Sequence, residues 1–436
     1  MYRKNLLLSW CRPYAAFAIT CTAVIFTLFG TSAAAQPLER RHDPFSIKEV
    51  FDSAWSRQPE ARSLSAREEA SAARLEAASS LTAEPATLEL LGKTDRLNRN
   101  QGGREYEVGI ALPLWLLGER SRTIALAEAE TQTLTAKVAA AKLRIAASVR
   151  EAYWSWQLAL VEHALVRDRL ASARGIATDV AKRVRAGDLA RADQHQADGN
   201  LAAAESAFAE SQALLTATHQ KMRQITGIPL QLNTGTIVAD ATQRAETLPR
   251  IKAQASNLEG THPQIAEPAA QAEAARRAAD LARVQSRANP ELTLSTTRER
   301  GDFANQYQQS ITVGLRIPFG SSARHRSKNA QALAEALEAD TQLSLAQDRV
   351  AAEFETARQR VESVRLMADA ANKRAGLARE TRGFFERSFR AGETDLPTRL
   401  RIELEAIEAE RQAQRTQIDY AASISALRQA MGLLPD

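Results

Sequence analysis

The sequence predicts a mainly α-helical protein with a small β part, in which one structural unit occurs twice. Three observations predict this fold class. Two stretches of about seventy residues contain no proline, which is typical of very long helices. Short segments alternate apolar and polar residues as β-strands do. A set of glycines and prolines recurs at one fixed spacing, which indicates an internal repeat.

The fixed spacing is 205 residues and relates two turn segments, Arg185-Ala186-Gly187-Asp188 and Arg390-Ala391-Gly392-Glu393. It also relates Pro85 to Pro290, Gly109 to Gly314, Pro113 to Pro318 and Gly227 to Gly432. Glycine and proline have special backbone geometry, so their joint recurrence indicates that the backbone itself is repeated. We therefore expect a first copy at 36–227, a linker at 228–260 and a second copy at 261–436.

The first 35 residues are typical of a secretory signal peptide. Arg3 and Lys4 provide the charged start, an apolar run follows over 15–29, and small residues at 33–35 suit cleavage. An uncleaved membrane anchor is the alternative. Cys11 and Cys21 both lie in this segment, so we expect no disulfide or thiolate chemistry in the mature chain. The residues before Cys21 fit a lipoprotein signal poorly.

Removal of the signal peptide takes away three basic residues and no acid, which lowers the formal net charge from +5 to +2. No dense basic patch with interleaved aromatic residues remains, so we expect no nucleic-acid partner. The mature chain has no later run of about 20 apolar residues, so we expect no membrane-spanning helix in it.

Each copy is expected to contain a helical start, a β-hairpin and two antiparallel helices. In the first copy, 45–84 is helical with a break near Pro59, and strands follow at 87–94 and 105–112, separated by a polar loop. In the second copy the clearest strand is 310–317. Its partner at 291–297 carries its apolar residues one position out of step with the first copy.

Long helices follow each hairpin, at 119–186 and 321–391. At 1.5 Å per residue each would extend on the order of 100 Å. Shorter helices are expected to return from the glycine turns, at 189–226 and 396–431, with Pro397 in a first helical turn. The linker at 228–260 is expected to lie against the middle of the helical body.

The two hairpins have the length and alternation of strands that cross a bilayer, although a soluble hairpin packed on a helix is the alternative. A sheet in lipid must close, because unpaired edges leave backbone groups without partners. Four strands are too few for a barrel of about eight or more. The sequence therefore predicts a barrel shared by several chains, continued by a tube of helices.

The strand-to-proline junctions at 109–113 and 314–318 and the two Arg-Ala-Gly turns resemble the TolC family of outer-membrane efflux ducts. This resemblance covers nearly all of the mature chain. It implies a homotrimer with a 12-stranded transmembrane barrel in the outer membrane lipid and a 12-helix periplasmic barrel. It also implies two partners, a periplasmic adaptor (membrane fusion) protein and an inner-membrane pump of the RND class.

The segment Tyr153-Trp154-Ser155-Trp156, the poor lipoprotein signal and the short C-terminus most resemble the channels that export cobalt, zinc, cadmium or nickel ions. Multidrug and type I protein-secretion ducts share the same plan. A helical-hairpin adaptor without a membrane barrel is the alternative from a different class. It would need a β-rich domain, for which 228–260 is too short.

The two turns are the candidate site for a periplasmic gate and for adaptor contact. Its residues are Arg185, Gly187, Asp188, Asp193, Arg390, Gly392, Glu393 and Asp395. Rings of acids at a narrow mouth favour cations, and the arginines could pair with them to hold the mouth shut. Alternatively, the acids stabilise the next helix N-terminus, and the glycines serve the backbone reversal. At the place of Asp193 the second copy has Thr398.

No motif supports an enzyme, a cofactor or a bound metal. The six histidines show no paired metal-ligand spacing, and no nucleophile elbow, phosphate loop or zinc-protease motif occurs. Trp115 and Phe319, just after the strands, are candidates for an interfacial aromatic belt, with core packing as the alternative.

Overall fold

The computed structural model describes residues 46–98, 100–227, 245–249, 261–320 and 322–436. The expected signal peptide, with Cys11 and Cys21, and most of the linker at 228–260 lie outside the described residues. Among the described helices, none combines the length and apolar character needed to cross a bilayer.

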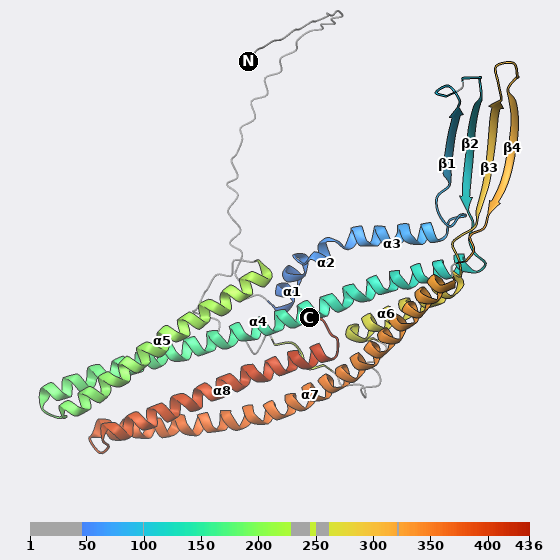
Figure 1. Ribbon diagram of the computed structural model, residues 1–436. Helices are drawn as coiled ribbons and strands as arrows, with labels where there is room; N and C mark the ends of the chain where they lie inside the picture. The colour runs from blue at the N-terminus through green and yellow to red at the C-terminus, as the bar shows by residue number, and fades with distance from the viewer. Residues whose placement is uncertain (1–45, 99, 228–244, 250–260, 321) are drawn as a thin grey trace, which may run out of the picture. The chain divides into compact units, whose positions relative to one another are not determined.

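The element order agrees with the one expected from the sequence (Figure 1). In chain order the elements are α1 (Ile47–Ser56), α2 (Pro59–Arg62), α3 (Leu64–Ala78), β1 (Thr87–Thr94), β2 (Arg104–Pro113), α4 (Glu119–Ala186), α5 (Arg191–Thr226), α6 (Pro263–Val284), β3 (Glu291–Arg300), β4 (Gln308–Arg316), α7 (Ser322–Ala391) and α8 (Leu396–Ala430). Pro59 does break the first helical region, since it begins the short helix α2. The second hairpin is longer than expected, because β3 extends to Arg300.

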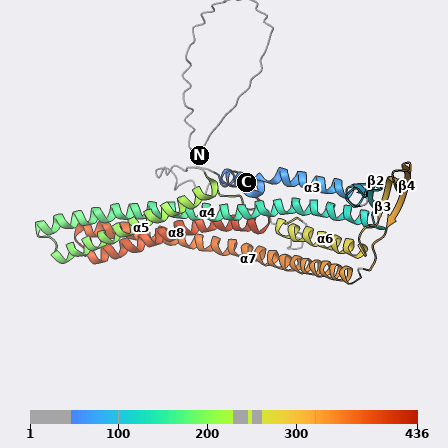
Figure 2. The same ribbon diagram turned by 45° about the horizontal axis from the view of Figure 1, so that its top comes forward.

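The long helices α4 and α7 carry the other helices. Helices α3 and α5 pack along successive lengths of α4, and α6 and α8 pack along α7, while α6 and α8 also contact α4 (Figures 1 and 2). Much of the buried surface is alanine, which lets helices approach closely. Larger side chains gather around Tyr153, Trp154 and Trp156 of α4, all of which are buried.

The four strands form one antiparallel sheet in the order β1-β2-β3-β4. The register explains the one-residue offset of β3. Leu294 lies opposite Ile110 of β2, and Ile110 lies opposite Leu88 of β1, so the apolar residues of all three strands share one face. Val313 of β4 continues the same row. Directly paired residues of antiparallel strands point to the same side of a sheet, so the offset leaves the pattern intact.

This apolar face of the sheet is exposed in the described part of the chain. It consists of the alternate positions 88–94, 104–112, 292–300 and 309–315. Most of its large apolar residues are exposed, with 74% for Ile311 and 70% for Leu90 and Val313. The outer edges of β1 and β4 have no neighbouring strand among the described residues. Exposed apolar strands with free edges are an arrangement that proteins avoid unless a partner or lipid covers them.

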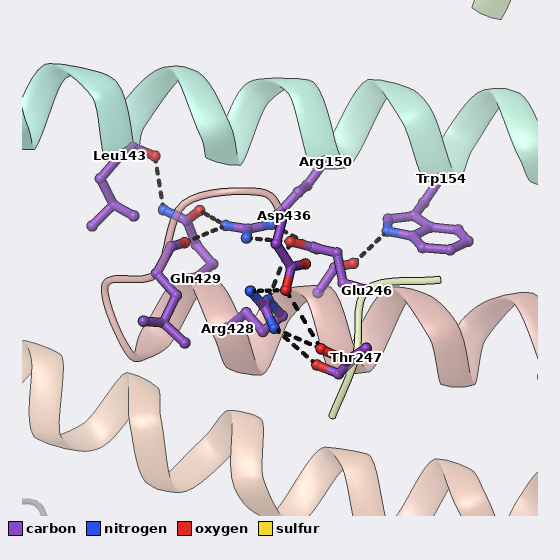
Figure 3. A network of polar contacts seen from close by, with 10 residues as sticks. Leu143, Arg150, Trp154, Glu246, Thr247, Arg428, Gln429 and Asp436 are labelled. Carbon is purple, nitrogen blue, oxygen red and sulfur yellow. Dashed lines mark hydrogen bonds and ion pairs between the residues drawn. The ribbon is translucent and has the colours of Figure 1, made fainter. Parts of the chain in front are cut away.

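The described part of the linker, 245–249, lies between α4 and α8, where Glu246 meets two arginines (Figure 3). Arg150 of α4 donates two hydrogen bonds to the Glu246 carboxylate, of 2.9 and 2.6 Å. Arg428 of α8 lies 3.3 Å from the same carboxylate and 2.8 Å from Asp436. Both arginines and Glu246 are buried, so the linker residue joins the two halves of the chain.

The two aromatic residues that follow the strands differ in their surroundings. The Trp115 indole donates a hydrogen bond of 3.2 Å to the Ser80 carbonyl, which ties it to the segment after α3. Phe319 is 93% exposed in the single chain. An interfacial role for either residue stays a prediction.

Candidate functional site at the helix turns

Gly187 ends α4 and reverses the chain. Its φ of 88° lies in the left-handed region, where a side chain is strained. The Asp188 N–H donates a hydrogen bond of 2.9 Å to the Arg183 carbonyl, and the Gly187 N–H donates one of 3.1 Å to the Val184 carbonyl. These bonds satisfy carbonyls that the helix end leaves free.

Gly392 ends α7 in the same way. Its φ is 80°, and the Glu393 N–H donates a hydrogen bond of 3.0 Å to the Ser388 carbonyl five residues back. The Ser388 and Thr394 hydroxyls add a hydrogen bond of 2.6 Å across this turn. The two Arg-Ala-Gly segments therefore have the same local backbone geometry, as their shared sequence leads us to expect.

Two of the four candidate acids cap the following helix. Asp193 accepts a hydrogen bond of 3.0 Å from the Ala190 N–H, and Asp395 accepts one of 3.2 Å from the Thr398 N–H. Hydrogen bonds from the Thr398 side chain, with the larger effect, and from the Thr398 backbone N–H hold the pKa of Asp395 below its ordinary value. At Asp193 and Asp395 the capping interpretation is thus realised, because each carboxylate satisfies a free donor at a helix start. Thr398, which stands where the first copy has Asp193, supplies the donor to Asp395 instead.

The other two acids are uncommitted. Asp188 and Glu393 are exposed, and neither lies within ion-pair distance of a cation in the part of the chain that the structure describes. Arg390 instead forms an ion pair with Glu386 one helical turn back, and Arg185 donates a hydrogen bond of 3.2 Å to the Ala181 carbonyl. The pairing of these arginines with Asp188 and Glu393 that the sequence suggested is therefore not present among the described residues.

Phe389 also belongs to this site, although no motif of the sequence singles it out. Its ring is 2% exposed and lies between two guanidinium groups, 4.9 Å from that of Arg183 and 4.6 Å from that of Arg399. Arg183 belongs to α4 and Arg399 to α8, so one aromatic ring of α7 connects both turns through cation–π contacts. Comparison of the copies does give a signal, because Phe389 stands where the first copy has the smaller Val184.

The apolar core below the turns joins the same elements. Val180 of α4, Ala197 of α5 and Leu396 and Leu400 of α8 are buried together with Phe389. The two turns of one chain are therefore packed against each other and present Asp188 and Glu393 at their exposed end.

Charges on the sheet are separated by face. All five strand acids, Glu89, Glu105, Glu107, Glu291 and Glu299, occupy alternate positions on the polar face, opposite the apolar one. Lys93 and Arg316 share the polar face and are paired there with Glu105 and Glu291 at 3.3 and 3.0 Å. The polar face is thus acidic in net terms. Among the described residues, no group of three or more potential ligand side chains could hold a metal ion.

Comparison with known proteins agrees with the resemblance inferred from the turns and junctions. Residues 52–228 match a family model described as outer membrane efflux protein. No protein with a curated description matches the chain by sequence.

Three solved structures share the fold. They are the CmeC outer membrane channel of Campylobacter jejuni (17% identity, 88% of this chain and 85% of that chain, TM-score 0.69), the outer membrane protein VceC of Vibrio cholerae (16%, 89% and 97%, 0.69) and the open state of the MtrE outer membrane channel of Neisseria gonorrhoeae (15%, 89% and 89%, 0.72). The predicted fold class, mainly helical with a small sheet, is confirmed. The likeness extends over the second half of the chain, beyond the residues that the family model matches.

Proposed function

We propose that this chain is one of three identical subunits of an outer-membrane efflux duct that exports divalent metal cations. The observation that carries the proposal is the sheet, which among the described residues has two free edges and an exposed apolar face. Lipid would cover the apolar face, and pairing of β4 with β1 of the next subunit would remove both edges. Three sheets of four strands give twelve, within the range of known membrane barrels.

The helices give the duct its length and its docking end. Two copies of one unit within the chain supply two hairpins and two helix pairs, and the exposed turns lie at the helix ends remote from the sheet (Figure 1). We infer that these turns reach through the periplasm to an adaptor protein and an RND pump in the inner membrane. No chemistry is assigned to the chain itself, since a duct guides its cargo and leaves energy coupling to the pump.

The polar face of the sheet supports a cationic cargo. In a closed barrel this face would line the lumen and bring five glutamates per subunit into it, two of them paired with Lys93 and Arg316. Rings of carboxylates raise the local concentration of cations and exclude anions. Selectivity of this kind comes from the electrostatic field of the carboxylates and needs no site that binds the metal ion tightly.

Membrane fractionation and planar-bilayer recording test the duct. The full chain is expected in the outer-membrane fraction as a detergent-stable trimer with cation-selective pores. A chain that purifies as a monomer without detergent and forms no pores would refute the duct. An anion-selective pore would refute only the cationic cargo, and loss of metal tolerance after gene deletion, with drug tolerance unchanged, would support it.

Loss of the two acids that follow Gly392 is expected to open the pore. Glu393→Ala, alone and with Asp395→Ala, should raise single-channel conductance about twofold or more, because carboxylates that constrain the mouth are removed. Glu405→Ala, which removes an exposed acid farther along α8, is the matched control and should leave conductance unchanged. If the Glu393→Ala channel and the Glu393→Ala/Asp395→Ala channel had the conductance of the unchanged channel, these acids would not be part of a gate.

Asp395 adds a pH dependence to the same experiment. Its pKa is lowered in the folded protein, so the cap is present at neutral pH and is lost only as pH falls through that lowered pKa. Conductance of the unchanged channel should therefore stay constant down to about pH 5 and rise only in stronger acid. In Asp395→Ala the rise attributable to this cap should be absent.

A further inference from the structure

Three arginines end the apolar face of the sheet on the side of the hairpin loops. Arg104 of β2 lies opposite Arg300 of β3, and Arg298 lies opposite Tyr106 one row below. These positions alternate with the polar face and continue the rows of Val108 and Ile110. The apolar face therefore passes directly into a basic cluster, defined here as Arg104, Arg298 and Arg300.

The basic cluster has no acidic partner in the part of the chain that the structure describes. No carboxylate of the described residues lies within ion-pair distance of the three guanidinium groups, since the strand glutamates all lie on the opposite face. The guanidinium carbons of Arg298 and Arg300 each lie 4.8 Å from the centre of the Tyr307 ring. Stacking on a ring leaves the N–H groups of an arginine free to bind an anion.

The loops that follow the strands hold the cluster in place. The Arg300 Nε–H donates a hydrogen bond of 3.2 Å to the Gly102 carbonyl, and the Phe303 N–H donates one of 2.9 Å to the Gln101 carbonyl. Gly102 has a φ of +100°, and a Cβ added there would lie 2.6 Å from the Phe303 backbone nitrogen. The two hairpin loops are therefore closely docked, and the arginines they flank need little reordering to bind a ligand.

We propose that the basic cluster binds a phosphate-bearing glycolipid of the outer leaflet, with its acyl chains along the apolar face and its phosphates on the arginines. This inference rests on the proposed function, because it needs the apolar face to be turned toward lipid. Arginine forms paired hydrogen bonds to phosphate, and the unbalanced charge of the cluster is complementary to it. The continuous apolar rows below the cluster favour a lipid over an acidic peptide or a free anion.

Binding of a labelled lipid tests the site. The full chain, purified as its oligomer in detergent, is titrated with fluorescent lipid A, a glycolipid with two phosphates. Arg104→Gln/Arg298→Gln should weaken binding about tenfold or more, since two charge-assisted contacts are lost. Arg300 is kept, because its bond to Gly102 braces the loops. The matched control, Lys93→Gln/Arg96→Gln, removes two cations at the same end of the sheet and should change the affinity less than about twofold.

Further measurements separate the sources of the signal. Dephosphorylated lipid A should bind about tenfold more weakly, and millimolar inorganic phosphate should not displace the labelled lipid. Arg298→Lys in the Arg104→Gln background should restore part of the affinity, which a variant with damaged loops would not do. Unchanged binding by the double variant, equal binding without phosphates, or displacement by free phosphate would overturn the proposal.

The same preparations distinguish this inference from the proposed function. If the unchanged protein forms trimers and conducts ions while the double variant binds lipid normally, the lipid site is wrong and the duct stands. If the unchanged protein forms neither trimers nor pores, the duct itself is refuted.

Discussion

Glu246→Gln is expected to destabilise the middle of the helical body strongly. The neutral amide would leave Arg150 and Arg428 buried side by side without the carboxylate that both contact. Breaking a buried ion pair by removing one partner costs about 3–5 kcal/mol, because a buried charge is left uncompensated. Thermal unfolding in detergent should show a midpoint lowered on the order of 10 °C.

Asp436→Asn is the matched control, because Asp436 contacts the same Arg428 but its side chain is 52% exposed. Water replaces a partly exposed carboxylate easily, so the expected change is below about 1 kcal/mol. Replacing Arg150 by Met in the Glu246→Gln background should recover part of the loss. Arg150 has no other carboxylate partner among the described residues, whereas Arg428 keeps Asp436. Equal effects of Glu246→Gln and Asp436→Asn would contradict the assignment of Glu246 as the shared anion.

Gly187→Val together with Gly392→Val is expected to abolish export while trimers still form. Both glycines have positive φ, and each valine would cost about 1–2 kcal/mol in backbone strain even though nothing lies within 4 Å of an added Cβ. The strain falls on the turns, far along the helices from the sheet (Figure 1). Capture of the adaptor on an affinity column should fall about tenfold or more, and efflux in cells should be lost.

Gly175→Val/Gly376→Val provides the control. Both positions lie inside α4 and α7 with open space around them and without positive φ, so these changes should leave adaptor capture intact. Gly187→Asn/Gly392→Asn should retain intermediate capture, because asparagine tolerates the left-handed region better than valine. Dissociation of the valine variant into monomers would mean that the turns serve folding rather than docking.

Elements with a strong local pattern could be predicted from the sequence. The bounds of α4 agree with the prolines and glycines that delimit 119–186, and both turns form where Gly187 and Gly392 were expected to reverse the chain. β1 and β2 follow the period-two alternation. These features depend on residues near one another in the chain. Most of them also occur twice, at the 205-residue spacing, so each could be predicted from two segments of the sequence.

Capping roles were open at the level of sequence. An acid shortly after a helix turn can cap the next helix or remain free, and residue type alone does not decide between these states. The structure separates Asp193 and Asp395, whose carboxylates accept backbone hydrogen bonds, from Asp188 and Glu393, whose carboxylates have no such partner among the described residues. The offset in β3 was likewise resolved only by the register of its neighbours.

By itself, the sequence determined the order of helices and strands, the places of both turns and the resemblance to an efflux duct, because periodicity and glycine geometry act locally. Only the tertiary structure decided which distant residues meet: Phe389 between Arg183 and Arg399, Glu246 between Arg150 and Arg428, and the arginines of β2 and β3 on the apolar face. Such contacts join residues far apart in the chain, and packing and strand register place them, which no local pattern encodes.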